Sequence, residues 1–318
     1  MYFPYLYGRG AELLALRDVS ERLHDWNTVP VVEPTKIDGA ALVRCLAGLR
    51  TGGARCHLVV NPSHGEFKAG IPAAWTTQMA GYIADQSVVI PTFQISAPSD
   101  GHGLSRFLAD FAGREVGVVV RSADVGPANL AAALVGASAR VFLHTSSNPH
   151  SFLSVSALVG AVPIENQFNV QARNADYNGS EWFTSSHRLF LDAKRSGFSD
   201  FTLLPNTFSD SGGPPGAVAV HLSYIAADGS VWVQHFVSDS VDVGDGDVGS
   251  KMAEVVAKID SEINATPGKF VSSTGLAAFS RQHANSTPTG LATSKRQQIA
   301  HHLATVGSSF VAASRVSV

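Results

Sequence analysis

Residues 116–144 read VGVVVRSADVGPANLAAALVGASARVFLH and hold one complete unit of the pattern that decides the fold. The apolar run 116–120 predicts a strand that ends at Arg121. Pro127 is a favoured first residue of a helix, and the alanine-rich segment after it favours helix. The run 141–143 predicts the next strand, which ends at His144. Because the first strand is apolar throughout rather than at alternate positions, we expect a parallel sheet covered by helices on both faces.

The same alternation continues in both directions from this unit. Apolar runs predict strands at 2–7, 28–32, 56–60, 88–95, 161–164 and 198–204. Between them, apolar spacing predicts helices at 12–25, 38–50, 73–84, 104–111, 151–158 and 181–194. About eight such units favour a closed (β/α)8 TIM-like barrel. The alternative is an open doubly wound sheet, but Gly8-Arg9-Gly10 is a poor version of its glycine-rich first turn.

The pattern changes after residue 204. Asp228-Gly229 lies between apolar runs and predicts a β-hairpin with a two-residue loop. In that register His221 and His235 point to opposite faces, whereas a three-residue loop would place them on one face. Helices are expected at 252–263 and 295–313, separated by a segment rich in Pro, Gly, Ser and Thr. We therefore expect a barrel with an added β-hairpin over residues 1–240 and a helical C-terminal extension over 241–318.

Composition sets limits on the class of protein. Of 318 residues, 45% are hydrophobic and 15% are charged, as in a globular protein with a sizeable core. The net charge of -3 gives no strong signal for nucleic acid. No apolar run is long enough to cross a bilayer, and no secretory signal opens the chain. Cys45 and Cys56 match no zinc or redox motif, so we expect buried, reduced thiols and a cytoplasmic protein.

Polar residues follow nearly every predicted strand, at the end where barrels of this kind carry their active sites. The candidate catalytic residues are Glu33, Lys36, His144 and Glu165. The candidate ligand-binding residues are Arg9, Asn61, Arg121, Arg173, Asn174 and Asp176. His64 and Glu66 also follow a strand, and Gln94 lies near the end of the strand at 88–95, but we assign these three residues no separate role from the sequence.

These residue types suit an anionic ligand. Glu33 and Glu165 can hold a divalent metal or act as a general base, since burial raises the pKa of a carboxyl group. Arginine grips phosphate or carboxylate with its planar fork, lysine can neutralise a phosphate or form a Schiff base, and His144 can move a proton. The competing interpretation is a polar plug in which Arg121 pairs with Glu165. Elsewhere, we expect His235 in the core and His187, His301 and His302 at the surface.

Several motifs carry a resemblance to a known family. They are Tyr2-Phe3-Pro4-Tyr5-Leu6, Arg173-Asn174-Ala175-Asp176-Tyr177, Gly197-Phe198-Ser199-Asp200, Gly212-Gly213 and His235-Phe236-Val237-Ser238-Asp239. Over roughly residues 1–260 the chain resembles the Beta protein family of phage and bacterial proteins, which has no established activity. Members are often encoded beside predicted nucleases in mobile or phage-defence neighbourhoods. The bacterial branch carries an acidic pair and a lysine before the position of Arg173, and this chain lacks the lysine.

Two functional hypotheses follow. The first is an enzyme that acts on a phosphate-bearing or other anionic small molecule or peptide at the barrel mouth, with a divalent metal as the candidate cofactor. The alternative is a non-catalytic sensor or scaffold that binds a nuclease partner or a phage protein. For this alternative the resemblance implies a protein partner from a neighbouring gene.

Overall fold

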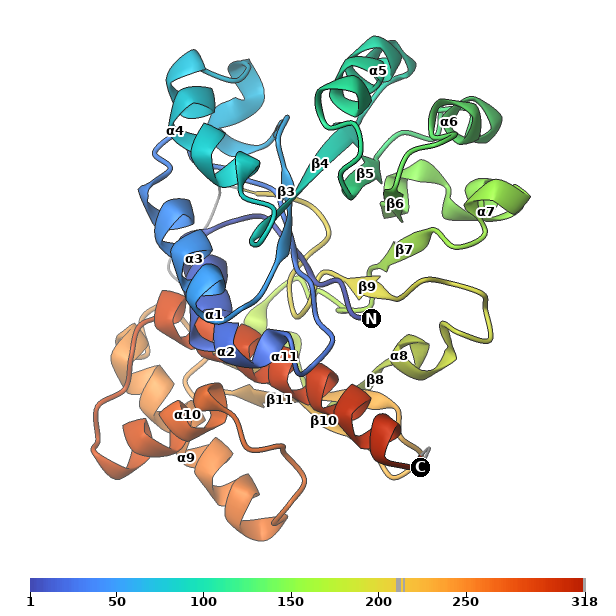
Figure 1. The fold of residues 1–318 in the computed structure, drawn as a ribbon. Coiled ribbons are helices and arrows are strands. Elements are labelled where there is room, and N and C mark those ends of the chain that lie inside the picture. Colours follow the sequence, from blue (N-terminus) through green and yellow to red (C-terminus); the bar gives the residue numbers. More distant parts are fainter. Residues whose placement is uncertain (210–212, 214, 317–318) are drawn as a thin grey trace. The chain divides into compact units, whose positions relative to one another are not determined.

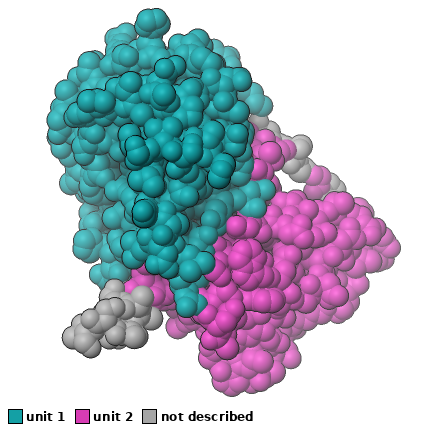
Figure 2. Space-filling view, turned by 90° about the vertical axis from the view of Figure 1, so that its right-hand side faces the viewer, with its two compact units in different colours: residues 1–9, 20–166, 186–201 teal, residues 10–19, 167–185, 202–318 magenta. Residues whose placement is uncertain are grey.

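A computed structural model of the chain describes residues 1–209, 213 and 215–316. These residues form two compact units, coloured separately in Figure 2. The barrel unit comprises residues 1–9, 20–166 and 186–201. The hairpin unit comprises residues 10–19, 167–185 and 202–318. Three positions of the 211–215 Ser-Gly-Gly-Pro-Pro segment, 211, 212 and 214, lie outside the described residues.

Among the described residues, eight parallel strands make up the barrel unit's sheet, and the predicted (β/α)8 TIM-like barrel is confirmed (Figure 1). In spatial order the strands are β1 (Tyr5–Leu6), β2 (Val31–Val32), β3 (Cys56–Val59), β4 (Val89–Ile95), β5 (Val116–Val120), β6 (Ala139–Leu143), β7 (Val162–Glu165) and β9 (Ser199–Asp200). A parallel bridge between Tyr2 and Phe198 joins the last strand to the first, so the barrel is nearly closed.

Helices alternate with these strands around the barrel (Figure 1). They are α2 (Ser20–Leu23), α3 (Ala40–Thr51), α4 (Ala73–Ala84), α5 (Gly101–Asp110), α6 (Pro127–Ala133), α7 (Pro149–Leu153) and α8 (Ser186–Leu189). The predicted burial of β5 on both faces is confirmed. Val116, Val118 and Val120 pack outward with residues of α5 and α6, while Gly117 faces His57 and Thr92 in the barrel interior.

The hairpin unit is a three-stranded antiparallel sheet with helices. Its strands are β8 (Ser180–Thr184), β10 (Ala219–Ile225) and β11 (Val231–Val237), in the order β10-β11-β8. Its helices are α1 (Gly10–Asp18), α9 (Val248–Ala265), α10 (Thr274–Ala284) and α11 (Leu291–Val316). One hydrophobic core joins Val220 and Leu222 of β10 to Val255 and Ile259 of α9.

Three local predictions were wrong. The helix expected at 181–194 is strand β8 followed by the short α8, because β8 pairs with β11, a partner far along the chain. The segment 265–293, for which no helix was predicted, contains α10, whose first turn is capped by the Ser273 side chain accepting from the backbone N–H of Leu276. Finally, the strand expected at 198–204 is confined to Ser199–Asp200.

The hairpin register also differs from the prediction. Ala226 and Ser230 are the last bonded pair, so the loop contains three residues, and Gly229 adopts a left-handed conformation with φ 79°. This is the common three-residue hairpin loop, in which glycine supplies the positive φ. The shift of one residue places His221 directly opposite His235 on one face of the sheet.

Candidate functional site

The carboxyl ends of β1 to β6 bring together a connected polar network around Glu33 and Arg121. Glu33 follows β2 and its side chain has no exposed surface. Its Oε1 accepts from His64 Nδ1 at 2.6 Å and from the backbone N–H of Ser63 at 3.3 Å. Its Oε2 accepts from the Tyr5 hydroxyl at 2.6 Å and from Arg121 Nη2 at 2.8 Å. Both carboxylate oxygens are therefore occupied by donors.

These donors decide the charge of Glu33. Burial by itself raises the pKa of the carboxyl group, as the sequence analysis assumed. The hydrogen bond from His64 and the positive charge of Arg121 outweigh burial, so the pKa of Glu33 lies below its usual value. Glu33 is thus an ionised acceptor, an arrangement that suits holding its neighbours in place better than taking up a proton.

Arg121, which follows β5, lies at the centre of the network. Its Nε donates to Gln94 Oε1 at 2.7 Å, and its guanidinium lies 5.5 Å from the centre of the Tyr5 ring and 5.6 Å from that of Tyr7. Burial alone would lower the pKa of Arg121, but Tyr5 and Glu33 outweigh it and raise the pKa. The guanidinium therefore stays charged although its side chain is only 10% exposed.

His144 and His64 border Arg121 and Glu33. The Nε2 atom of His144 lies 3.3 Å from Arg121 Nη1, and because a guanidinium can only donate, this Nε2 must be the acceptor. The Nδ1 atom of His144 lies 2.8 Å from the Ser146 hydroxyl. The side chain of His64 is 25% exposed and its ring packs against Tyr7. Sequence reasoning gave His64 no role, since nothing in the local sequence shows that Glu33 is its partner.

The other candidates in the barrel unit have different surroundings. Asn61 bonds twice to the backbone of Gln94, at 2.8 and 2.7 Å, and so ties the ends of β3 and β4 together. Lys36 forms an exposed ion pair with Glu66 at 2.9 Å. Arg9 is half-buried after β1. Glu165 accepts from the Ser186 hydroxyl at 2.5 Å. The suggested pairing of Arg121 with Glu165 was wrong, because Arg121 pairs with Glu33.

The remaining three candidates belong to the hairpin unit. Arg173 forms an exposed two-bond ion pair with Asp176, at 2.6 and 3.2 Å. Asn174 donates to the backbone oxygen of Ala217 at 2.8 Å. Arg173 and Asn174 line a cavity of about 510 Å³ with Gly216 and Asp242. Arg173, Asn174 and Asp176 are therefore neighbours of one another and belong to the hairpin unit, whereas Glu33 belongs to the barrel unit.

A histidine cluster in the hairpin unit was missed because the predicted register separated its members. His221 Nδ1 and His235 Nδ1 are 2.8 Å apart, and His235 Nε2 lies 3.3 Å from Glu181 Oε1. The Tyr177 ring packs on both imidazoles. Burial lowers the pKa of both histidines, so they are neutral near pH 7. His235 in the core was correctly predicted.

Three other histidines correct the sequence interpretation. His187, His301 and His302 are all buried, not at the surface as predicted. His302 Nδ1 lies 2.6 Å from the hydroxyl of Ser223, and His301 Nε2 lies 2.9 Å from the backbone oxygen of the same residue. Both belong to α11, which packs on α1, α10 and β10 and is therefore covered on several sides. Cys45 and Cys56 are buried free thiols, as predicted.

Within residues 1–209, 213 and 215–316, no three His, Cys, Asp or Glu side chains are grouped so that they could hold a metal ion. In the same ranges, no helix is both long enough and apolar enough to pass through a membrane. Comparison of the chain with family models, curated proteins and solved structures found no match. Membership of the Beta protein family stays a prediction that rests on the motifs quoted above.

Proposed function

We propose that the barrel unit is an enzyme for a small anionic substrate, and that His64 moves a proton at the carboxyl ends of the strands. The observation that carries this proposal is the 2.6 Å contact between His64 Nδ1 and the buried carboxylate of Glu33. In characterised barrels of this type the active site lies at the same end of the strands.

The Glu33–His64 pair has the properties of a general acid–base. An ionised carboxylate that accepts from Nδ1–H fixes the tautomer of the ring and makes Nε2 the nitrogen that takes or gives a proton. Glu33 is buried whereas the side chain of His64 is 25% exposed, so His64 is the member of the pair that a substrate reaches. In this proposal Glu33 and Arg121 are positioning residues, and Arg121 keeps Glu33 ionised.

The preference for an anion rests on cationic side chains at the same strand ends. Lys36 follows β2, and its side chain is 64% exposed. Arg9 follows β1. A phosphate or carboxylate group can displace Glu66 from Lys36, since exposed ion pairs are weak. Arg121 is less suited to contact the ligand, because Glu33 and Gln94 already accept from it.

The proposal is tested with generic phosphoester and carboxylester probes, p-nitrophenyl phosphate and p-nitrophenyl acetate. If either is turned over, His64→Gln is expected to lower the rate about 100- to 10,000-fold, the usual contribution of general acid–base catalysis. His102→Gln, an exposed histidine of α5, is the matched control and should leave the rate unchanged. Wild-type rates in a folded His64→Gln variant would contradict the assignment, as would the absence of turnover and of any phosphate- or acetate-induced thermal shift.

A further inference from the structure

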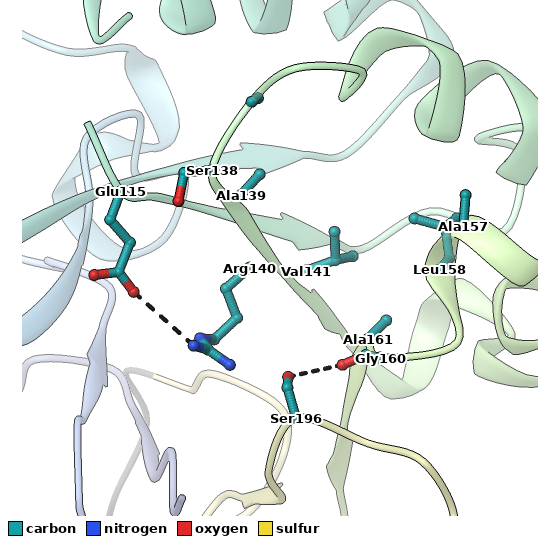
Figure 3. Close-up of a pocket in the computed structure, with 11 residues that line it drawn as sticks. Glu115, Ser138, Ala139, Arg140, Val141, Ala157, Leu158, Gly160, Ala161 and Ser196 are labelled. Atoms are coloured by element: carbon teal, nitrogen blue, oxygen red, sulfur yellow. Dashed lines mark hydrogen bonds and ion pairs between the residues drawn. The ribbon is translucent and has the colours of Figure 1, made fainter. Parts of the chain in front are cut away.

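A cavity of about 360 Å³ lies at the opposite, amino-terminal ends of the barrel strands. Its lining comes from the residues that enter β5, β6, β7 and β9, together with the short turn Ser156–Leu158 (Figure 3). Glu115 precedes β5, Arg140 lies in β6, and Ser196 precedes β9. The cavity is thus separate from the Glu33–His64 pair, which lies where the strands end.

Arg140 is the unusual residue of this cavity. Its side chain is only 22% exposed, yet its buried Nε has no hydrogen-bond partner among the described residues. Its one ion pair there, from Nη2 to Glu115 Oε1, is 3.9 Å long, beyond hydrogen-bonding distance. The guanidinium instead lies 4.8 Å from the centre of the Phe3 ring. A half-buried guanidinium normally bonds to acceptors, so this one is left with unused donors.

Glu115 compensates Arg140 only in part, because it is already engaged by a second arginine. Arg55 Nη1 donates to Glu115 Oε2 at 2.9 Å. The three side chains together carry one net positive charge. Burial lowers the pKa of Arg140, and Glu115 opposes this only in part. An additional anion at this site would accept hydrogen bonds from the unused donors of Arg140 and would neutralise the net positive charge.

The other side of the cavity is apolar. Figure 3 shows Arg140 directed toward Glu115, with Val141, Ala157 and Leu158 on the opposite side and Ser196 bonded to Gly160 between them. A ligand that fits has a planar two-oxygen head for the guanidinium fork and a short apolar tail for this wall. We propose that the cavity binds a small monocarboxylic acid, with its carboxylate on Arg140 and its tail against Ala157 and Leu158.

The test is calorimetric titration of the intact protein with acetate, butyrate, hexanoate and benzoate, with inorganic phosphate as the alternative oxyanion. We expect the tailed acids to bind more tightly than acetate, with affinity that falls as salt is raised. Arg140→Met should weaken butyrate binding at least tenfold. Arg106→Met, which removes an arginine that is 84% exposed on α5, should leave it unchanged. His64→Gln should also bind butyrate normally, so a failure of this proposal can be told apart from a failure of the proposed His64 function.

A second variant guards against misfolding of Arg140→Met. Ala157 is exposed and lines the cavity, so Ala157→Trp fills the space without disturbing the core and should abolish butyrate binding. Undiminished binding in both variants, or no heat from any acid, would overturn the proposal. Binding of phosphate with no binding of the carboxylates would also overturn it, because the tail contact would then play no part.

Discussion

Removing the charge of Glu33 is expected to cost a large part of the stability of the barrel unit. In Glu33→Gln, an amide nitrogen replaces one carboxylate oxygen and faces two donors, either Tyr5 and Arg121 or Ser63 and His64. Arg121 is then a buried cation without its counter-ion. Breaking a buried pair in this way costs about 3–5 kcal/mol. Arg121→Met should cost a similar amount, since it leaves the Glu33 carboxylate without the opposite charge.

The double variant Glu33→Gln with Arg121→Met shows whether the stability losses of the two single variants have the same cause. Each single variant leaves one buried charge without its counter-charge, whereas the double variant removes both charges. Its destabilisation should then fall short of the sum of the single variants by about 0.5–3 kcal/mol, the range found for residues in direct contact. Urea unfolding monitored by tryptophan fluorescence measures the free energies of unfolding of the three variants, provided that the dependence of the free energy on urea concentration is the same in each.

Lys36→Met is the matched control, because it breaks an exposed ion pair at the same end of the barrel. Its unfolding midpoint should equal that of the wild type. The reasoning fails if Glu33→Gln unfolds within 1 kcal/mol of the wild type, or if the costs of the two single variants simply add.

Three further predictions concern two residues of the hairpin unit and one residue of the barrel unit. Burial lowers the pKa of His301 from 6.5 to about 4. As the pH falls below 6.5, the unfolded chain therefore binds a proton at this residue while the folded protein does not. The stability that is present above pH 6.5 is lost progressively as the pH falls to 4. The loss is about 1.4 kcal/mol per pH unit and about 3 kcal/mol in all; His301→Gln should flatten the measured pH profile by this amount, and an unchanged slope would refute it. Gly275→Ala in α10 should destabilise by about 1–3 kcal/mol, because a Cβ there overlaps the backbone oxygen of Gln297. Gly81→Ala in α4, where a Cβ meets nothing within 4 Å, should instead stabilise by about 0.4–1 kcal/mol in the same urea assay.

The parts of the fold that follow from local sequence were predictable. The continuous apolar run of β5 and the turn residues after it indicated a buried parallel strand, and the structure agrees. β8 was not predictable in this way, because its strand conformation comes from pairing with β11, about fifty residues later. The hairpin register depended on the conformation of one residue, Gly229, and a shift of one position was enough to hide the contact between His221 and His235.

In the candidate site, too, local sequence predicted some features and left others open. Position after a strand identified Glu33, Arg121 and His144 as residues of one end of the barrel, and the structure places them in one network. Which of them pair was beyond the sequence, because partners such as Glu33 and Arg121 are 88 residues apart. The pKa of Glu33 was expected to rise on burial, and its partners reverse that direction. Only a three-dimensional arrangement gives the number of donors around a carboxylate.

The hairpin unit draws on three separated parts of the chain, and this affects the order in which the protein can assemble on the ribosome. Asp18 of α1 bonds to Arg296 of α11 through two contacts of 2.5 Å, yet 278 residues separate them. The face of α1 that α11 covers therefore stays exposed until almost the whole chain has been synthesised. A nascent chain in this state exposes the leucines of α1 to chaperones, and a fragment beginning at residue 202 would lack both α1 and β8.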